Sequence, residues 1–328
     1  MPKTLGLVAD PVVVAETVER TGPDVAARLR GDWHVRTDEQ TFAAGQELSE
    51  LSQRAGQLAD EHGWDAVIGL TDLPMVVDGE TVLADVSPGE RVAVLSVPAL
   101  GPLLLRRRLR RAVVRVAEAL ESGGDRRVIP IGGGGHVRLV LGMVAANHPV
   151  ALIRHLTGAG AAALGTTAIA LLNSSVWLVA DHLAPIRMAA ALLLSMAIMV
   201  GWLIVRHGLW EPVEEEEEGI LPAGRKRAAL FNAATVLTLA VGVIAMYALL
   251  LAVALASAAL VIAEGAVAST LGHGVGTGYY LKLAVFATSI GLVGGALGSG
   301  FESQDAVRRV AFGVRERHRR EEADAEPG

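Results

Sequence analysis

The chain of 328 residues contains no cysteine. This excludes disulfide bonds, thiolate ligands for metals and a thiol nucleophile. Aromatic residues form only 4% of the sequence, and lysine occurs three times among 29 basic residues, so arginine supplies nearly all of the positive charge. The net charge of -6 is modest and does not favour a nucleic-acid-binding role.

Apolar residues are abundant, at 52%, and they are unevenly distributed. Residues 1–125 carry charges throughout, whereas Ala, Leu, Val and Gly dominate residues 157–300, and the composition changes near residues 123–135. We therefore predict a soluble cytoplasmic α/β domain with a mixed sheet over residues 1–125. A glycine-rich linker with an interfacial helix follows over 126–155, then four transmembrane helices over 156–303, then a basic and finally acidic cytoplasmic tail over 304–328.

A helix needs about 20 apolar residues to cross the hydrocarbon core of a bilayer. Four nearly uncharged segments meet this requirement and predict an all-α four-helix transmembrane bundle. They cover residues 156–179, 186–205, 231–263 and 280–300. The third would reach roughly 50 Å as a straight helix, against a core of about 30 Å. We interpret it as one long helix that begins in the cytoplasmic interface, with a broken pair of helices as the alternative.

The distribution of basic residues predicts the orientation of these segments. Residues 206–227, between the second and third segments, contain four lysines or arginines, and the tail after residue 300 is rich in arginine. Residues 264–278, between the third and fourth segments, contain neither. The first residues, MPKTLGLVADP, lack the long apolar run of a signal peptide. We expect a multi-pass protein of the inner cell membrane with both termini in the cytoplasm.

Two segments before the first crossing are predicted to lie near the membrane surface. RAVVRVAEAL, residues 111–120, belongs to an amphipathic helix whose apolar stripe repeats at i, i+4, i+7 and i+11 from Leu109, with arginines around it. Residues 136–156 mix apolar residues with arginines and histidines, and Pro149 interrupts them. Arginines on such segments can contact anionic lipid headgroups, and a solvated basic face is the alternative. The membrane-surface candidates are Arg107, Arg111, Arg115 and Arg154.

Glycines in the fourth apolar segment repeat at a spacing of four residues in GLVGGALGSG. Such spacing lets two helix backbones approach closely. The glycines concerned are Gly291, Gly294, Gly295 and Gly298. We favour packing within one four-helix bundle, and a dimer seam is the alternative.

The N-terminal domain has the predicted order βαβαβ, then a hairpin around Asp78-Gly79, then a strand and the basic helix. Three aspartates lie at or near the ends of its predicted strands, where open α/β sheets often bind ligands. The ligand-pocket candidates are therefore Asp10, Asp72 and Asp85, and capping of turns or helices is their alternative role.

The segments AVIGLTDLP and VLADVSPGERVAVLSVPAL, with the helix that follows them, resemble the sheet and active-site helix of the archaemetzincin-type zinc peptidases. The resemblance covers about residues 1–122 and implies a zincin-like fold. In that family two histidines one turn apart bind zinc, and the glutamate beside the first is the general base. The matching positions here are Val114, Arg115 and Glu118, and no cysteine exists for the second zinc of the family. The resemblance thus implies a relative without the metal site.

The whole chain is similar to a group of multi-pass actinobacterial membrane proteins of unknown role, some of which are catalogued under a methylenetetrahydrofolate dehydrogenase name. The sequence does not support that activity, because such enzymes are soluble and bind a dinucleotide on a glycine-rich turn within a βαβ unit. The only glycine-rich candidate, VIPIGGGGHVRL at residues 128–139, is not placed in such a unit. We interpret it as a flexible linker rather than a phosphate-binding turn.

These observations favour a non-enzymatic protein that binds a ligand or acts as a scaffold through a cytoplasmic α/β domain held at the membrane. A membrane-bound, hydrolase-like enzyme that uses the strand-end aspartates is one alternative. A transporter or channel with a cytoplasmic regulatory domain is another, although the apolar segments lack the charged groups that proton coupling needs. We expect membrane lipids, a protein at the cytoplasmic face and a second copy of the chain as candidate partners, and no nucleic acid, cofactor or metal.

Overall fold

The computed structural model describes residues 3–9, 18, 21–29, 32–39, 48–77, 80–132, 134–147, 149, 156–211 and 222–298. The chain divides into two compact units. Unit 1 comprises Met1–Asn147, Glu211–Ala234 and Phe312–Gly328, and unit 2 comprises His148–Trp210 and Thr235–Ala311. Unit 1 contains a mixed sheet with helices, and the described part of unit 2 is helical, which confirms the predicted fold class at this level.

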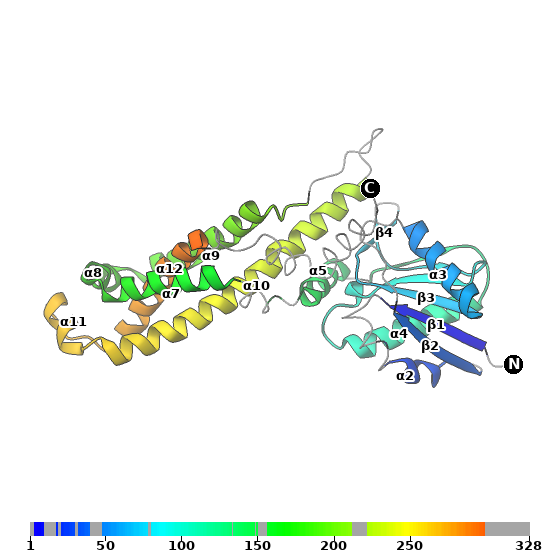
Figure 1. The fold of residues 1–328 in the computed structure, drawn as a ribbon, viewed down its shortest axis with the longest axis horizontal. Helices are drawn as coiled ribbons and strands as arrows, with labels where there is room; N and C mark the ends of the chain where they lie inside the picture. The colour runs from blue at the N-terminus through cyan, green and yellow to red at the C-terminus, as the bar shows by residue number, and fades with distance from the viewer. Residues whose placement is uncertain are drawn as a thin grey trace, which may run out of the picture. The chain divides into compact units, whose positions relative to one another are not determined.

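A mixed seven-stranded sheet forms the centre of unit 1 (Figure 1). Its strands are β1 (Lys3–Ala9), β2 (Trp33–Glu39), β3 (Ala66–Thr71), β4 (Met75–Val77), β5 (Glu80–Ser87), β6 (Val92–Ser96) and β7 (Arg127–Pro130). The strand order is β2-β1-β3-β6-β5-β4, and β7 also pairs with β5. The first four strands in this order are parallel, whereas β5 runs antiparallel to β6, β4 and β7. Strands β3 and β6 are buried along their whole length, as expected for central strands covered on both faces.

Helices cover both faces of this sheet. They are α2 (Gly22–Ala26), α3 (Leu48–His62) and α4 (Leu105–Glu121). Unit 1 also contains the short 3-10 helix η1 (Pro98–Leu100) and the helix α5 (Gly135–Ala146). On one face Leu51 and Leu58 of α3 pack with Val67 and Val94 of the sheet. On the other face α2 and α4 share a core with the opposite side chains of the same strands. The apolar stripe predicted for α4 lies in this second core, because Leu109, Val113, Val116 and Leu120 are all buried.

The structure differs from the predicted linker over residues 126–155. Residues 127–130 form β7, which pairs with β5, and α5 belongs to unit 1. Only Ile129 of β7 is buried, and Pro130 ends the strand, so four residues give no alternating pattern that would predict it. The strand forms because β5 offers an unpaired edge along this stretch, and unit 1 therefore extends to Asn147 rather than to residue 125.

The helix α10 (Pro222–Val261) is uninterrupted over 40 residues, about 60 Å. It agrees with the prediction of one long helix, but it begins earlier, at Pro222. Its first turns belong to unit 1, where Leu230 and Phe231 pack with Leu139 and Met143 of α5. The remaining turns, from Thr235 onward, belong to unit 2.

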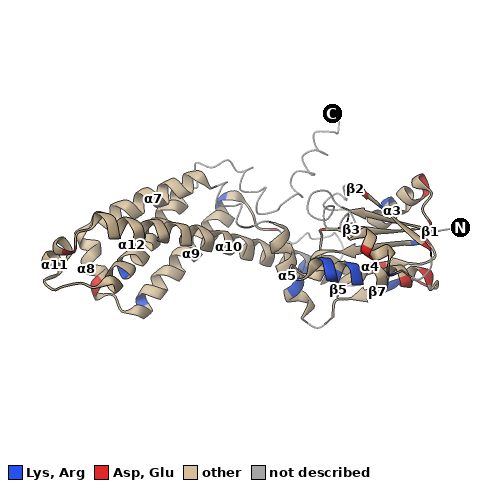
Figure 2. Cartoon of the chain, turned by 90° about the horizontal axis from the view of Figure 1, so that it is seen from below, with Lys and Arg blue, Asp and Glu red and all other residues tan. Residues whose placement is uncertain are grey.

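The other helices of unit 2 are α7 (Thr157–Leu172), α8 (Ser174–His182), α9 (Pro185–His207), α11 (Glu264–Leu271) and α12 (Thr277–Gly298). Within the described residues, three helices are long and apolar enough to cross a membrane, namely α9, residues 228–261 of α10, and α12. Figure 2 shows that these helices carry few charged residues. They coincide with the second, third and fourth predicted segments, and they make this chain a candidate membrane protein.

The first predicted segment, residues 156–179, is not one straight helix. It is divided between α7 and α8, which meet at an angle of 82°. Asn173 causes the break, because its backbone is extended and its side-chain oxygen accepts a hydrogen bond from the Ser175 amide at 2.9 Å, as an N-cap does. Trp177 then donates its indole N–H to the Leu171 carbonyl at 2.7 Å. The 16 residues of α7 span only about 24 Å, so this segment crosses a bilayer core only as a bent pair.

The glycine-rich face of α12 lies against α7 of the same chain. A Cβ atom at Gly291 would overlap the Thr167 hydroxyl, and a Cβ atom at Gly295 would lie 2.8 Å from the Ala159 carbonyl oxygen. Gly294 and Gly298 approach α7 in the same way, at Thr166 and Ala162. All four glycines thus bring two helix backbones of one chain together, as small residues do in membrane bundles.

We predict that Gly295→Ala destabilises the helical unit by about 1–3 kcal/mol, because the added methyl group has no room against the α7 backbone. The matched control is Gly201→Ala on α9, where a Cβ atom meets nothing within 4 Å, and which should be neutral or slightly stabilising. Thermal unfolding of the full chain in a nonionic detergent measures both effects. Equal melting temperatures for the two variants would contradict the close packing of α7 and α12.

Candidate functional site

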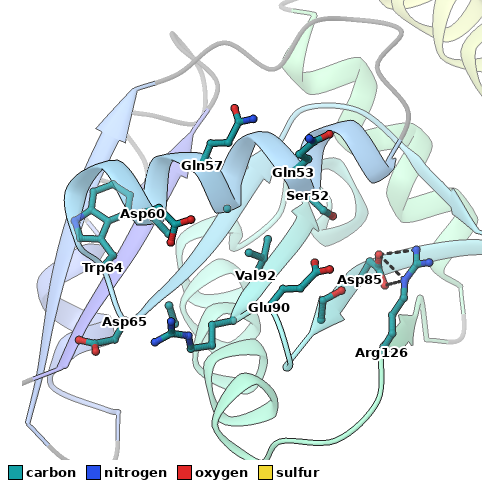
Figure 3. Close-up of a pocket in the computed structure, with 15 residues that line it drawn as sticks. Ser52, Gln53, Gln57, Asp60, Trp64, Asp65, Asp85, Glu90, Val92 and Arg126 are labelled. Atoms are coloured by element: carbon teal, nitrogen blue, oxygen red, sulfur yellow. Dashed lines mark hydrogen bonds and ion pairs between the residues drawn. The ribbon is translucent and has the colours of Figure 1, made fainter.

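A polar pocket of about 620 Å³ lies in unit 1, between α3 and the start of strands β3 and β6 (Figure 3). It lies on the α3 side of the sheet, beside Asp85 and Ser87 of β5. The charged residues that line it are Asp60, Asp65, Asp85, Glu90, Arg91 and Arg126. Amides and hydroxyls complete the lining, from Ser52, Gln53 and Gln57 of α3 and from Ser87.

Asp85 is the most deeply buried charge in this pocket, with 3% of its side chain exposed. Its carboxylate accepts hydrogen bonds from Nε and Nη2 of Arg126, at 2.9 Å and 2.8 Å, in a bidentate pair. The partner is 56% exposed, so the pair lies at the edge of the protein interior. Asp85 is on β5 and Arg126 immediately precedes β7, so the pairing of these two strands brings the ions together.

The other three carboxylates of the pocket differ in their hydrogen-bond partners. Asp65 accepts a hydrogen bond from the Thr4 amide at 2.7 Å, which fixes the loop before β3. Asp60 and Glu90 have no hydrogen bond or ion pair to their carboxylates within the described ranges, and Glu90 extends toward the Asp85–Arg126 pair (Figure 3). The pocket thus holds four carboxylates and two guanidiniums, and one guanidinium is already paired with Asp85.

The turn between β5 and β6 shapes the floor of the pocket. Its amides at Glu90 and Arg91 donate to the carbonyls of Ser87 and Pro88, both at 3.2 Å. Arg91 has a φ of 58°, a left-handed conformation that costs a non-glycine residue about 1–2 kcal/mol. Its carbonyl accepts a hydrogen bond from the Val67 amide at 3.0 Å, so pairing with β3 holds the strained residue in place.

Of the three predicted ligand-pocket residues, Asp85 lines this pocket. Asp72 follows the carboxyl end of β3 and is not part of the lining, and Asp10 lies outside the described residues. The pocket is at the amino ends of β3 and β6, whereas ligands of open parallel sheets usually bind beyond the carboxyl ends. Sequence reasoning missed Arg126, Asp60 and Glu90, because their meeting depends on β7 and on the position of α3.

A second polar surface lies on the opposite face of the sheet, along α4, where basic residues gather (Figure 2). The predicted membrane-surface residues Arg107, Arg111 and Arg115 are exposed there, and Arg154 lies outside the described residues. Arg111 and Arg115 share the lining of a smaller pocket of about 310 Å³ with Arg28, and Arg107 is not part of it. The acidic run at residues 214–218 also lies outside the described residues.

The positions that the zinc-peptidase resemblance singles out are Val114, Arg115 and Glu118. All three line the smaller pocket on α4. Within the described ranges no group of three or more His, Cys, Asp or Glu side chains is placed to hold a metal ion.

A third group of polar residues lies in unit 2, where α8 and the segment after α11 meet. His273 Nε2 and the Asp181 carboxylate are 3.1 Å apart, and His182 is within 3.9 Å of the same carboxylate. The Gly274 carbonyl and the Asp181 carboxylate raise the pKa of His273 above its usual range. Both histidines are more than half exposed, so this group is a solvated ion pair rather than an enclosed site.

Comparisons of the chain with protein-family models, with curated proteins and with solved structures find no match.

We predict that Arg126→Gln destabilises unit 1 by about 1–3 kcal/mol, because it leaves the buried Asp85 carboxylate without its cation. The figure is below that for a fully buried pair because Arg126 is half exposed. The double variant Asp85→Asn/Arg126→Gln should lose less than the sum of the two single variants. Pulse proteolysis of the full chain in increasing urea measures these differences.

The exposed pair Lys3–Glu121, at 3.3 Å, provides the control for that cycle. Removal of either partner should change the free energy of unfolding by less than about 1 kcal/mol. Equal coupling energies for the two pairs would contradict the claim that burial of Asp85 makes its ion pair with Arg126 stronger than an exposed pair.

Proposed function

We propose that this protein is a membrane-anchored binding protein. It crosses the membrane four times and holds its α/β domain at the cytoplasmic surface, where the pocket between α3 and β5 binds a small polar ligand that carries a positive charge. The observation that carries the ligand proposal is the pair of unpaired carboxylates, Asp60 and Glu90, beside the buried Asp85–Arg126 ion pair.

The packing of α10 in unit 1 supports an even number of crossings. Residues 211–234 belong to the same compact unit as the sheet, and Lys226 pairs with Glu80 of β5 at 3.0 Å. The domain and the start of α10 therefore lie on the same side of the membrane. In the sequence, α9 lies between the domain and α10 and crosses the membrane once. The chain must therefore cross a second time in this interval to return to the same side, and the bent pair of α7 and α8 is the segment that can do so.

The packing of α12 supports the same assignment. α7 lies along α12 from Gly298 to Gly291, and Tyr279, near the other end of α12, donates to the Trp177 carbonyl of α8 at 3.2 Å. The bent pair therefore accompanies α12 over most of its length. Together with α9, α10 and α12, the bent pair makes four crossings, and the arginine distribution favours the cytoplasm for the domain.

Exposed apolar side chains support contact between the domain and the lipid surface. Leu103 and Leu104, just before α4, are 73% and 65% exposed, and Val137 of α5 is 67% exposed. Arg138 joins these two segments, because its Nε donates to the Ala99 carbonyl at 3.0 Å. Because α5 also packs on the first turns of α10, the helix that we propose enters the bilayer, contact of these side chains with lipid is consistent with that assignment.

The charge of the α3 pocket indicates the class of ligand. Two carboxylates without partners attract a cation, and the amides of Gln53 and Gln57 can accept hydrogen bonds from its N–H groups. Trp64 adds an aromatic face to the lining, against which an organic cation can pack. A small amine fits these groups better than an anion, which would meet four carboxylates.

The crossing number can be tested with single cysteines, since the natural chain has none to interfere. Glu61→Cys on α3 and Ser269→Cys on α11 are both exposed sites. Four crossings place them on opposite sides, so a membrane-impermeant maleimide should label Ser269→Cys in intact cells and Glu61→Cys only after lysis. Labelling of both variants in intact cells, or of neither, would show that the bent pair of α7 and α8 does not cross.

The ligand class can be tested with putrescine, a small diamine, on the full chain in a nonionic detergent. If putrescine reaches about 100 times its Kd, it should stabilise the protein by about 2.7 kcal/mol. Asp60→Asn/Glu90→Gln should abolish the shift in melting temperature. The matched control Glu61→Gln/Asp125→Asn removes two exposed carboxylates outside the pocket and should retain it. Loss of the shift in both double variants would mean that net charge, and not the pocket, binds the diamine.

A further inference from the structure

A pocket lined mainly by arginines lies on the α4 face of unit 1, away from the acidic pocket. Its volume is about 310 Å³, and it lies between the turn after α2 and the outer surface of α4. Arg28 comes from the turn, and Arg110, Arg111, Val114, Arg115 and Glu118 come from the helix. Four guanidiniums and a single carboxylate therefore share one small cavity.

The fold itself does not require this concentration of charge. The side of α4 that packs on the sheet is apolar and buried, through residues such as Val113 and Val116. Arg111 and Arg115 are one turn apart on the other side and are exposed. Like charges at this spacing destabilise a helix slightly, so an anion in the pocket would relieve a repulsion that the chain otherwise carries.

Arg110 supplies an independent observation. Its Nη1 is 3.3 Å from the Asp24 carboxylate, which is 59% exposed. Its Nε is buried, and no residue in the described part of the chain accepts its hydrogen bond. A buried donor without an acceptor costs about 1–3 kcal/mol, so the structure has one guanidinium N–H available for a ligand oxygen.

We propose that this arginine pocket binds a phosphate group. A guanidinium presents its N–H donors in a planar fork that matches two oxygens of a phosphate, and several guanidiniums together balance a double negative charge. The phosphate belongs either to a soluble phosphorylated molecule or to the headgroup of an anionic lipid. The second source is within reach because Arg111 is seven residues after Leu104, about 10 Å along α4 from the exposed leucines.

The test uses the full chain in a nonionic detergent and two probes. Inorganic phosphate is titrated by calorimetry at low chloride, and phosphatidylglycerol, with phosphatidylcholine as the reference lipid, is followed by native mass spectrometry. Binding of phosphate alone assigns the pocket to soluble ligands, binding of phosphatidylglycerol alone assigns it to lipid headgroups, and binding of both means that the pocket accepts either source. Binding of neither probe overturns the proposal.

Three variants establish where the probes bind. Arg111→Gln/Arg115→Gln should raise the Kd at least about tenfold. The control Arg36→Gln/Arg106→Gln removes the same charge from exposed sites outside the pocket and should change the Kd less than about twofold. Glu118→Gln should lower the Kd about threefold, because it removes the carboxylate from the pocket, and misfolding cannot produce such a gain. Equal losses in the two arginine variants, or no gain with Glu118→Gln, would overturn the proposal.

Discussion

Leu230 and Phe231 of α10 are buried against Leu139 and Met143 of α5, within the same unit as the sheet. The same helix then continues without a break through 30 further residues, to Val261. Unit 1 therefore includes the first turns of α10, a candidate membrane span, through a packed core. The proposed side of the domain, the number of crossings and the nearness of its exposed leucines to lipid all depend on this one contact.

Within the described residues, the candidate spans carry few charges, and the two charged pockets lie in unit 1. The sheet separates two sites of opposite character. Asp85 and Ser87 of β5 point to the α3 side, whereas Ala84 and Val86 point to the α4 side and join its apolar core. The alternation of side chains along β5 thus directs Asp85 to the α3 side and apolar side chains to the α4 side. A cation and an anion can be held by the same small domain without competing, since a layer of buried aliphatic side chains lies between them.

Composition and periodicity predicted the elements that depend on a long or regular pattern. These are the apolar helices α9, α10 and α12, the buried strands β3 and β6, and the amphipathic α4. The failures depend on contacts between distant residues. Asn173 breaks the first apolar segment because its side-chain oxygen caps α8. A single capping residue hardly changes the mean hydropathy of a segment, so hydropathy does not predict this break. Strand β7 forms because β5 has a free edge, and only that pairing brings Arg126 to Asp85. The strand-end rule selected Asp85, but the pocket is completed by Asp60 and Glu90, whose spacing in the sequence gives no signal.

The two sites also differ in how much they depend on the surrounding protein. Asp85 is almost wholly buried, so its charge is stable only with a partner that the fold itself supplies, and Arg126 fills that role. The arginines of α4 are mostly exposed, and at physiological ionic strength their mutual repulsion is screened beyond about 8 Å. Arginines one turn apart on α4 are closer than this, so each such pair keeps a small repulsion, about 0.2–0.5 kcal/mol, in the absence of a ligand. The net positive charge of this surface would therefore distinguish one anion from another only weakly. Selectivity must come from the shape of the cavity and from the buried Nε of Arg110, which has no acceptor in the described part of the chain.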